Sequence, residues 1–190
     1  MATKRPKTTP TRDDVVNAAL KLAAKRDWGL VTLADIARGA GITLADLSAM
    51  FESREDIVAT YSRMIDREVL DSYPDGVPGN EDKDQLFEVL MERFDRLNDD
   101  RAALSSIIRA SCADPKQIIV TLPGIARSMN WTLEACGIDT NGWKGAARVL
   151  ALSGIFMWCL RTWKDDDSQD MSKTMAALDR GLDRFASLPL

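Results

Sequence analysis

The sequence predicts an all-α protein in which a small N-terminal three-helix domain precedes a larger helical domain, with about nine helices in total. Apolar residues recur at helical spacing along most of the chain, and no segment shows the alternation of a strand. At four of the predicted helix starts, a threonine or serine is followed three residues later by aspartate, which is a sequence signature of a helix start. These pairs are Thr11 and Asp14, Thr32 and Asp35, Thr43 and Asp46, and Ser53 and Asp56.

Composition excludes several classes of function. The 190 residues are 45% hydrophobic and 28% charged, which suits a folded chain of one or two domains. The chain has no histidine, so His-dependent catalysis is impossible. Cys112, Cys136 and Cys159 match no zinc spacing and suggest reduced thiols in a cytoplasm. Without a phosphate-cradling glycine loop or a nucleophile-plus-base pattern, we expect no enzyme activity and no cofactor.

The polar N-terminus and the length of the longest apolar run argue against export and against membrane insertion. The N-terminus is basic and polar, so no signal peptide is visible. The longest apolar run, residues 149–160, is too short to span a bilayer and is predicted to be a buried helix. We therefore expect a cytoplasmic protein with no integral membrane segment.

The first helix is predicted to begin after Thr11 and to run to about Trp28, where Gly29 ends it. Residues 32–51, TLADIARGAGITLADLSAMF, then predict two short helices joined by a tight turn at Gly41, because glycine accepts positive φ without a steric penalty. The spacing of Ala37, Gly41 and Leu47 is typical of a DNA-reading helix-turn-helix. The alternative is a helical hairpin with no role in DNA binding.

Charge is distributed unevenly along the chain. The net charge is −4, yet residues 1–56 hold nine basic and eight acidic residues. The first twelve residues carry Lys4, Arg5, Lys7 and Arg12 with no acid, and Pro6 and Pro10 interrupt them. Such an arm suits contact with phosphates. An ordinary solvated tail is the alternative interpretation.

From residue 53 to the end, the sequence predicts a connecting helix and then a series of larger helices. The connecting helix runs to about Ser72, and residues 73–83, YPDGVPGNEDK, form a loop. Asp114 is expected to cap a helix that kinks or breaks near Pro123, because proline removes a backbone donor. We place the domain boundary so that residues 1–52 form one domain and residues 53–190 the other.

The last helix carries an apolar seam at heptad spacing, and the helix before it is apolar nearly all round. Such surfaces favour a two-fold dimer through a four-helix bundle. The predicted interface residues are Leu150, Met157, Met171, Met175, Leu178, Leu182 and Phe185. The acidic run at residues 165–167, just before this helix, is interpreted as an acid-rich helix start, with a metal site as the alternative.

The sequence resembles the Tet-repressor family of bacterial transcription regulators over its whole length. Locally the resemblance rests on Leu33 to Ala37, Gly41 to Thr43, Leu47 and Phe51, followed by Ser53 and Arg54. It implies a palindromic double-stranded DNA operator, read in the major groove by the second helix of the motif, with Arg54 on a phosphate. The implied DNA-binding residues are Lys4, Arg5, Lys7, Thr32, Thr43, Leu44, Ala45, Asp46, Ser48, Ala49, Met50, Ser53 and Arg54.

The chain departs from this family where the DNA contact is expected. Ser48 replaces the usual tyrosine and Met50 the usual histidine, and residues 43–50 contain no Arg, Lys, Asn or Gln. Those four residue types make bidentate contacts to bases. Base readout would therefore rest on Thr43, Ser48 and apolar contacts to thymine methyl groups.

The family resemblance also implies an effector-binding cavity in the larger domain for a small apolar or lipid-like molecule. The candidate lining residues are Met64, Phe87, Met91, Phe94, Ile108, Met129 and Phe156, each of which could instead be plain core. A second resemblance, at residues 163–180, is to Coq9-type proteins, which share the fold, bind lipids and isoprenoids and are not thought to act on DNA. The sequence thus predicts a ligand-responsive DNA-binding repressor, with a Coq9-like lipid-binding protein as the alternative.

Overall fold

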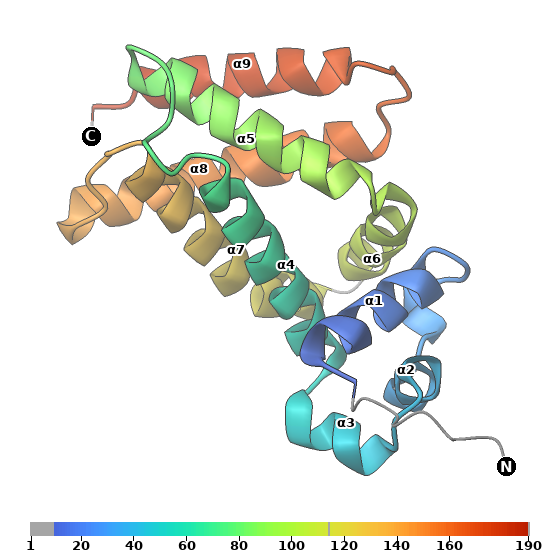
Figure 1. Cartoon of the computed structure of the whole chain (residues 1–190). Helices are drawn as coiled ribbons and strands as arrows, with labels where there is room; N and C mark the ends of the chain where they lie inside the picture. Colours follow the sequence, from blue (N-terminus) through green and yellow to red (C-terminus); the bar gives the residue numbers. More distant parts are fainter. Residues whose placement is uncertain (1–9, 114, 190) are drawn as a thin grey trace, which may run out of the picture.

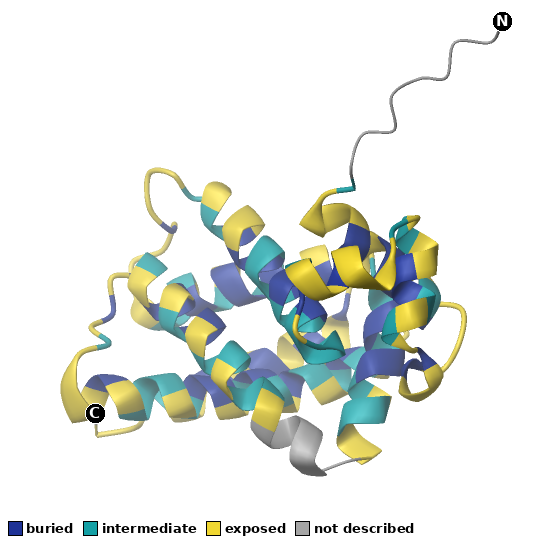
Figure 2. Cartoon of the chain, turned by 90° about the horizontal axis from the view of Figure 1, so that it is seen from below, coloured by how far each residue is buried: buried dark blue, intermediate teal, exposed yellow. Residues whose placement is uncertain are grey.

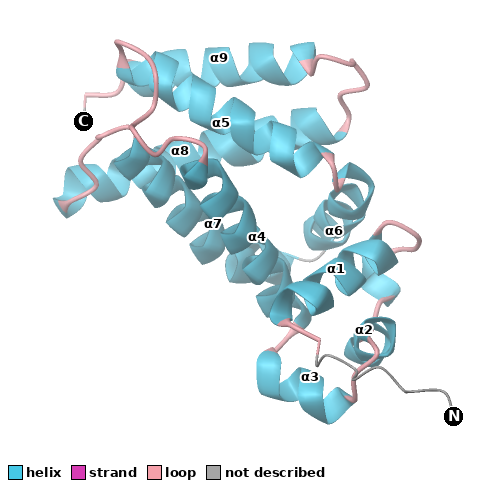
Figure 3. Cartoon of the chain, viewed as in Figure 1, coloured by secondary structure: helices cyan, strands magenta, loops and turns pink. Residues whose placement is uncertain are grey.

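The computed structural model describes residues 10–113 and 115–189. For residues 115–119 it describes the backbone alone. This part of the chain is helical throughout, with no strand (Figure 3), and the predicted fold class is confirmed. The helices are α1 (Arg12–Ala23), the 3-10 turn η1 (Trp28–Leu30), α2 (Leu33–Ala40), α3 (Leu44–Met50), α4 (Arg54–Asp71), α5 (Asp82–Asn98), α6 (Arg101–Ala113), α7 (Pro115–Ala135), α8 (Gly142–Lys164) and α9 (Ser172–Ala186).

The helices are arranged in an elongated body with α1, α2 and α3 at one end and α5, α8 and α9 at the other (Figure 1). α4 and α7 pack side by side and run between the two ends. α1 packs against α4 and α6, and α9 packs against α5 and α8. α4 therefore joins the helix-turn-helix end of the molecule directly to its larger helical end.

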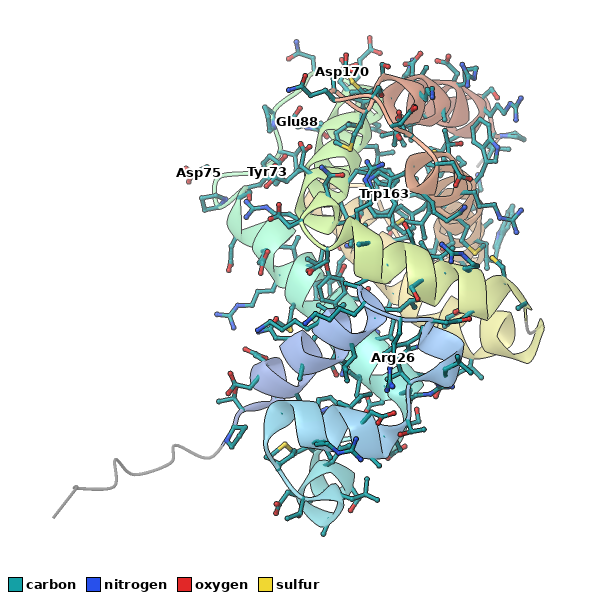
Figure 4. All side chains as sticks on the ribbon, turned by 90° about the vertical axis from the view of Figure 1, so that its right-hand side faces the viewer. Arg26, Tyr73, Asp75, Glu88, Trp163 and Asp170 are labelled. Carbon is teal, nitrogen blue, oxygen red and sulfur yellow. The ribbon has the colours of Figure 1, made fainter. Side chains whose placement is uncertain are left out.

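A single apolar core runs through both ends of the molecule. It extends without interruption from Val15 in α1 to Leu182 in α9, and the buried residues line the inward faces of the helices (Figure 2). In the larger end, the Phe94 ring centroid lies 5.4 Å from that of Phe156 and 6.2 Å from that of Trp163. Figure 4 shows Trp163 between α5 and the C-terminal helices. The division at residue 52 stays a prediction.

Two predicted helix boundaries are wrong. α1 ends at Ala23, because the chain turns there and the amides of Lys25 and Arg26 both bond the Leu22 carbonyl. Trp28 lies in a separate 3-10 turn, capped by Asp27 through the Gly29 amide at 2.9 Å. α7 continues through Pro123, so the helix does not break there, and the alternative of a kink stays a prediction. A long helix packed against α4 and α8 tolerates the loss of one backbone hydrogen bond. The predicted cap at Asp114 lies outside the described residues.

The acidic run lies in the loop before α9, and its middle residue, Asp166, is buried and caps the start of that helix. Asp166 is 1% exposed, and its carboxylate accepts hydrogen bonds from the Ser168 amide and hydroxyl and from the Thr174 amide and hydroxyl. Burial alone would raise the pKa of Asp166, but these four donors hold it well below its usual range. In the described ranges, no three His, Cys, Asp or Glu side chains gather as a metal site. Nor does the described chain include a helix long and apolar enough to cross a bilayer.

Candidate nucleic-acid interface

The first helix of the motif begins with a complete capping box. The Asp35 amide donates to the Thr32 hydroxyl at 3.2 Å, and that hydroxyl donates to the Asp35 carboxylate at 2.8 Å. The hydrogen bonds from Thr32, together with the Arg26 guanidinium, lower the pKa of Asp35 to about 2. The predicted start of α2 is therefore confirmed, and its first turn is held by a carboxylate that stays charged at neutral pH.

The turn between α2 and α3 contains the positive φ that was predicted at Gly41. Gly41 has a φ of 72°, in the left-handed region. The Gly41 amide bonds the Arg38 carbonyl at 3.2 Å, and the Ile42 amide bonds the Ala37 carbonyl at 3.0 Å. These two bonds form a Schellman motif, which ends α2 and directs the chain into α3.

The second helix of the motif, α3, is fixed from its start and from its inner face. The Asp46 amide donates to the Thr43 hydroxyl at 3.1 Å, and the same hydroxyl donates to the Asp46 carboxylate at 2.6 Å. These hydrogen bonds lower the pKa of Asp46. Leu47, which is 1% exposed, anchors the helix in the core, and Phe51, 3% exposed, follows in extended conformation.

The outer face of α3 is open to solvent and mostly apolar. The exposed positions are Leu44, Ala45, Asp46, Ser48 and Ala49, and Met50 is half-buried. The Ser48 hydroxyl donates to the Ala45 carbonyl at 2.8 Å. Because Thr43 and Asp46 are also bonded to each other, the polar side chains of this face are all engaged within the helix. The face itself therefore offers mainly methyl and methylene groups.

Arg54, which the family resemblance implies is on a phosphate, bonds backbone carbonyls of its own chain. Its Nη1 donates to the backbone carbonyls of Trp28 at 2.8 Å and Val31 at 2.7 Å. Its guanidinium carbon also lies 5.5 Å from the centroid of the Trp28 ring. Arg54 thus adds a donor to the Trp28 carbonyl of η1 and to the Val31 carbonyl that follows it, and so fixes the start of α4 against this turn. Contact of the remaining guanidinium nitrogens with a phosphate stays a prediction.

An open groove of about 390 Å³ lies where the starts of α2 and α4 come together. The groove is lined by Gly29, Val31, Thr32, Leu33, Glu52, Ser53, Arg54 and Glu55.

The predicted capping box at Ser53 is only half formed. Ser53 accepts a hydrogen bond from the Asp56 amide at 3.1 Å, but the Asp56 carboxylate accepts one from the Glu52 amide, at 3.4 Å, and not from the Ser53 amide.

Three basic side chains near the motif are paired with acids. Asp35 forms ion pairs with Arg26 and with Arg38, whose side chain is nevertheless 77% exposed. Arg12 lies 3.8 Å from Asp56, with its guanidinium carbon 4.3 Å from the Phe51 ring centroid. Lys4, Arg5 and Lys7 of the predicted basic arm lie outside the described residues.

A serine on α6 ties the helix-turn-helix end to the larger helices. The Trp28 amide donates to the Ser106 hydroxyl at 2.9 Å, and that hydroxyl donates to the Arg26 carbonyl at 3.2 Å. The Tyr61 hydroxyl on α4 adds a bond of 3.0 Å to Asp100. Ser106 is not among the residues predicted from the sequence, because a small polar residue within an apolar helix carries no signal of a contact almost 80 positions away.

The predicted effector-binding residues fall into two groups. Phe94, Met129 and Phe156 are buried core, whereas Met64, Phe87, Met91 and Ile108 are half-buried. None of the seven borders the groove described above or a void of about 10 Å³ beneath Trp28. An effector cavity at these residues stays a prediction.

The predicted dimer-interface residues fall into two groups. Met171, Leu178 and Leu182 are each at most 5% exposed within the single chain, where α9 packs on α5 and α8, and their contact with a second protomer stays a prediction. A Cβ at Gly181 would lie 2.6 Å from Ile155 on α8, which shows how closely the two helices approach.

The other predicted interface positions are accessible. Leu150 is 62% exposed and Met175 is 39% exposed, while Met157 and Phe185 are half-buried. Sequence analysis missed Trp158, which is 39% exposed. A helix that is apolar nearly all round does not reveal from sequence alone which of its faces is covered by its own chain.

No family model matches the sequence. The HTH-type transcriptional regulator AlkX of Mycobacterium tuberculosis (strain ATCC 25618 / H37Rv) is 28% identical over 116 residues, which are 61% of this chain and 49% of that protein. The chain thus matches about half the length of this curated relative.

Solved structures resemble nearly the whole chain. A TetR transcriptional regulator from Nitrosomonas europaea ATCC 19718 has a TM-score of 0.70 and 23% identity, covering 94% of this chain and 99% of its own. Thermus thermophilus FadR, a TetR-family repressor in complex with lauroyl-CoA, has a TM-score of 0.62 and 14% identity, covering 95% of both chains. The chain has the fold of the TetR-family regulators, as the first resemblance implied.

Proposed function

We propose that this chain is a homodimeric, ligand-responsive DNA-binding transcription regulator of the TetR type, acting as a repressor in the cytoplasm. The observation that carries the proposal is the exposure of α3. A complete capping box and buried Leu47 hold this short helix in place, and its outer face is open to solvent. A helix fixed in this way and exposed on one side fits the major groove of DNA.

The chemistry of α3 sets how it would recognise its operator. Leu44, Ala45 and Ala49 can contact thymine methyl groups, which mark A·T pairs in the major groove. Ser48 can turn its hydroxyl from the Ala45 carbonyl to a base edge. Phosphate contacts from the basic arm and from the helix starts at Thr32 and Ser53 would supply affinity without sequence information. Specificity would therefore come from few hydrogen bonds and from DNA shape.

A dimer is supported by the apolar surface that α8 and α9 leave uncovered. Leu150 and Trp158 on α8 and Met175 on α9 are exposed, and Gly154 has open space where a Cβ would stand. A two-fold contact through this surface would place two copies of α3 on successive half-sites of a palindrome. The proposed interface thus uses the outer faces of α8 and α9, whereas the heptad-spaced Leu178 and Leu182 pack within the protomer.

An apolar effector is supported by two observations. FadR, which shares the fold, is solved in complex with lauroyl-CoA. In this chain, flexible or aromatic side chains are half-buried at Met64, Phe87 and Met91 in the larger end, and such side chains repack readily around a ligand. The effector would act on α4, since this helix links the larger end to the motif.

The decisive experiment is selection of bound fragments from the source genome in moderate salt. An enriched palindrome, with binding that weakens steeply as salt rises, is the expected result. A variant with Leu47→Ala, which loosens α3 from the core, serves as the negative control. Absence of any enriched sequence would overturn the proposal.

A second candidate is a Coq9-like lipid-binding protein that does not act on DNA. The observation that favours it is the lack of a free polar side chain on the outer face of α3, where Thr43, Asp46 and Ser48 are all bonded internally. It predicts weak, sequence-indifferent DNA binding together with an isoprenoid lipid that copurifies with the protein. Extraction and mass spectrometry of the purified protein, beside the genomic selection, would separate the two candidates.

A further inference from the structure

The larger end of the molecule contains a buried ion pair that joins two helices. Arg93 of α5 is 4% exposed and Asp66 of α4 is 8% exposed, and Arg93 Nη1 donates to Asp66 Oδ1. The pair between Arg96 and Glu92 on the outer face of α5 is more accessible, with side-chain exposures of 42% and 25%. Burial of two charges carries a large desolvation cost, and an apolar pair of the same size is often as stable. Packing alone therefore gives little reason for this pair.

The guanidinium of Arg93 is only partly satisfied. Nη2 donates to the hydroxyls of Ser62 at 3.2 Å and Ser128 at 3.3 Å, both long contacts. Nε is buried and has no hydrogen-bond partner among the described residues. One oxygen of the Asp66 carboxylate accepts a hydrogen bond from Arg93 Nη1. The other oxygen accepts one from the Ser128 hydroxyl at 2.8 Å. The Nε–Nη2 edge is thus left with two weak neutral contacts and one vacant donor.

That edge has the geometry that binds a carboxylate. Two parallel N–H donors of a guanidinium match the two oxygens of a carboxylate, and such charge-assisted bonds are about twice as strong as neutral ones. The surroundings favour an apolar molecule around the charge, because the guanidinium carbon lies 5.3 Å from the Phe156 ring centroid and that ring stacks on Phe94. We propose that the Nε–Nη2 edge of Arg93 recognises the carboxylate of an otherwise apolar acid, which displaces the hydroxyls of Ser62 and Ser128.

This inference rests on the proposed ligand response and gives it a mechanism. A ligand carboxylate beside Arg93 brings a second negative charge close to Asp66, and like charges within a few ångströms repel strongly in a buried site. Ser62 and Asp66 both belong to α4, and the same event removes the Ser62 contact to Arg93. The ligand therefore loosens α4 from α5. Because α4 begins at Arg54, soon after the motif, the two copies of α3 would shift relative to each other.

The test compares decanoate with decanol, which has the same chain but no charge, on the full-length protein below the micelle concentration. Isothermal titration should give at least about tenfold tighter binding of decanoate, as expected for hydrogen bonds to a charged group. Arg93→Ala would leave Asp66 buried and unpaired, so the informative variant is the double replacement Arg93→Met with Asp66→Leu, which keeps the volume apolar. This variant should lose the preference for the acid and still bind decanol.

A matched control is the double replacement Arg96→Met with Glu92→Leu, which removes an exposed pair from the same helix. It should keep the preference for decanoate. Equal affinity of the unmodified protein for acid and alcohol, or a preference that survives in the Arg93 and Asp66 variant, would overturn the inference. So would a lack of binding by every acid from octanoate to palmitate. Genomic selection with the ligand-free protein separates the outcomes, since an enriched palindrome without an acid response removes only this inference.

Discussion

The helix-turn-helix end and the larger helical end of this molecule are each stabilised by internal polar contacts. These contacts differ in how far apart in the sequence the bonded residues lie. At the starts of α2 and α3, each side-chain capping contact joins residues three positions apart, as between Thr32 and Asp35. In the larger end, Arg93 reaches Asp66 across 27 positions, and Ser128 reaches the same carboxylate across 62. The first kind of contact forms with the helix itself, whereas the second exists only after α4, α5 and α7 have packed.

This difference implies different costs of disruption. A capping bond lies near solvent, so water can replace a lost partner. The Arg93 cluster is enclosed, so removal of one member leaves a charge or a donor with no substitute. Mutations in the two regions therefore measure how much of the stability each kind of contact provides.

The largest effect is expected from Arg93→Ala. It leaves Asp66 as an unpaired buried charge, and we expect a loss of about 3–5 kcal/mol in the free energy of unfolding. Urea titration followed by far-UV circular dichroism measures it. The double variant with Arg93→Met and Asp66→Leu should regain most of this loss. A loss below about 1 kcal/mol for Arg93→Ala would show that the cluster is more hydrated than its burial indicates.

Asp166→Ala should have the next largest effect, because it removes the acceptor of the Thr174 amide and hydroxyl at the start of α9. We expect a loss of about 1–3 kcal/mol. The pKa of Asp166 is lower in the folded protein than in the unfolded chain, so its contribution is complete above the unfolded pKa of about 4. As the pH falls further towards the folded pKa, the contribution is lost, and the difference between the two proteins should narrow. A difference that stays constant down to pH values near 2 would contradict this assignment.

The capping boxes of the motif should each contribute less. Thr32→Ala and Thr43→Ala remove the acceptors of the Asp35 and Asp46 amides, and each should cost about 1 kcal/mol. Thermal unfolding of the two single variants and of the double variant measures both values and their sum. Because the boxes belong to different helices, the effects should add to within about 0.5 kcal/mol. A strongly non-additive result would mean that α2 and α3 are capped as one unit.

Leu150→Glu should change the stability of the protomer little, since the side chain is 62% exposed. Surface substitutions of this kind usually stay within about 0.5 kcal/mol. It should nevertheless convert dimers into monomers, because a charge would be buried without a partner in the proposed interface. Sedimentation or light scattering provides the measurement, with Arg67→Glu on the outer face of α4 as a control. Monomers of the unmodified protein at micromolar concentration would rule out the interface.

The range of the contacts also explains which features the sequence could predict. The starts of α2 and α3 and the turn at Gly41 were predicted correctly, because the residues that form them are neighbours in sequence. The heptad spacing of Leu178 and Leu182 correctly indicated a covered face of α9, but spacing cannot tell whether the cover is the same chain or a second one. The Arg93 cluster could not be predicted, since its members come from three helices and each residue is unremarkable within its own helix.

The smallest effect on stability is expected at Ser48, on the outer face of α3. Its hydroxyl bonds only the Ala45 carbonyl, which already belongs to a helix, so Ser48→Ala should change the free energy of unfolding by less than about 0.5 kcal/mol. Its effect on DNA should be selective, because it removes the one hydroxyl on this face that can turn to a base edge without opening a cap. Arg38→Ala is the comparison, since this side chain is 77% exposed and lies on α2, from which we expect it to contact phosphates and no base edge. Repeating the genomic selection should show a changed base preference for Ser48→Ala and uniformly weaker binding for Arg38→Ala, with a reduced salt dependence. If Ser48→Ala leaves the preferred sequence unchanged, readout rests on the methyl groups of α3 and on DNA shape alone.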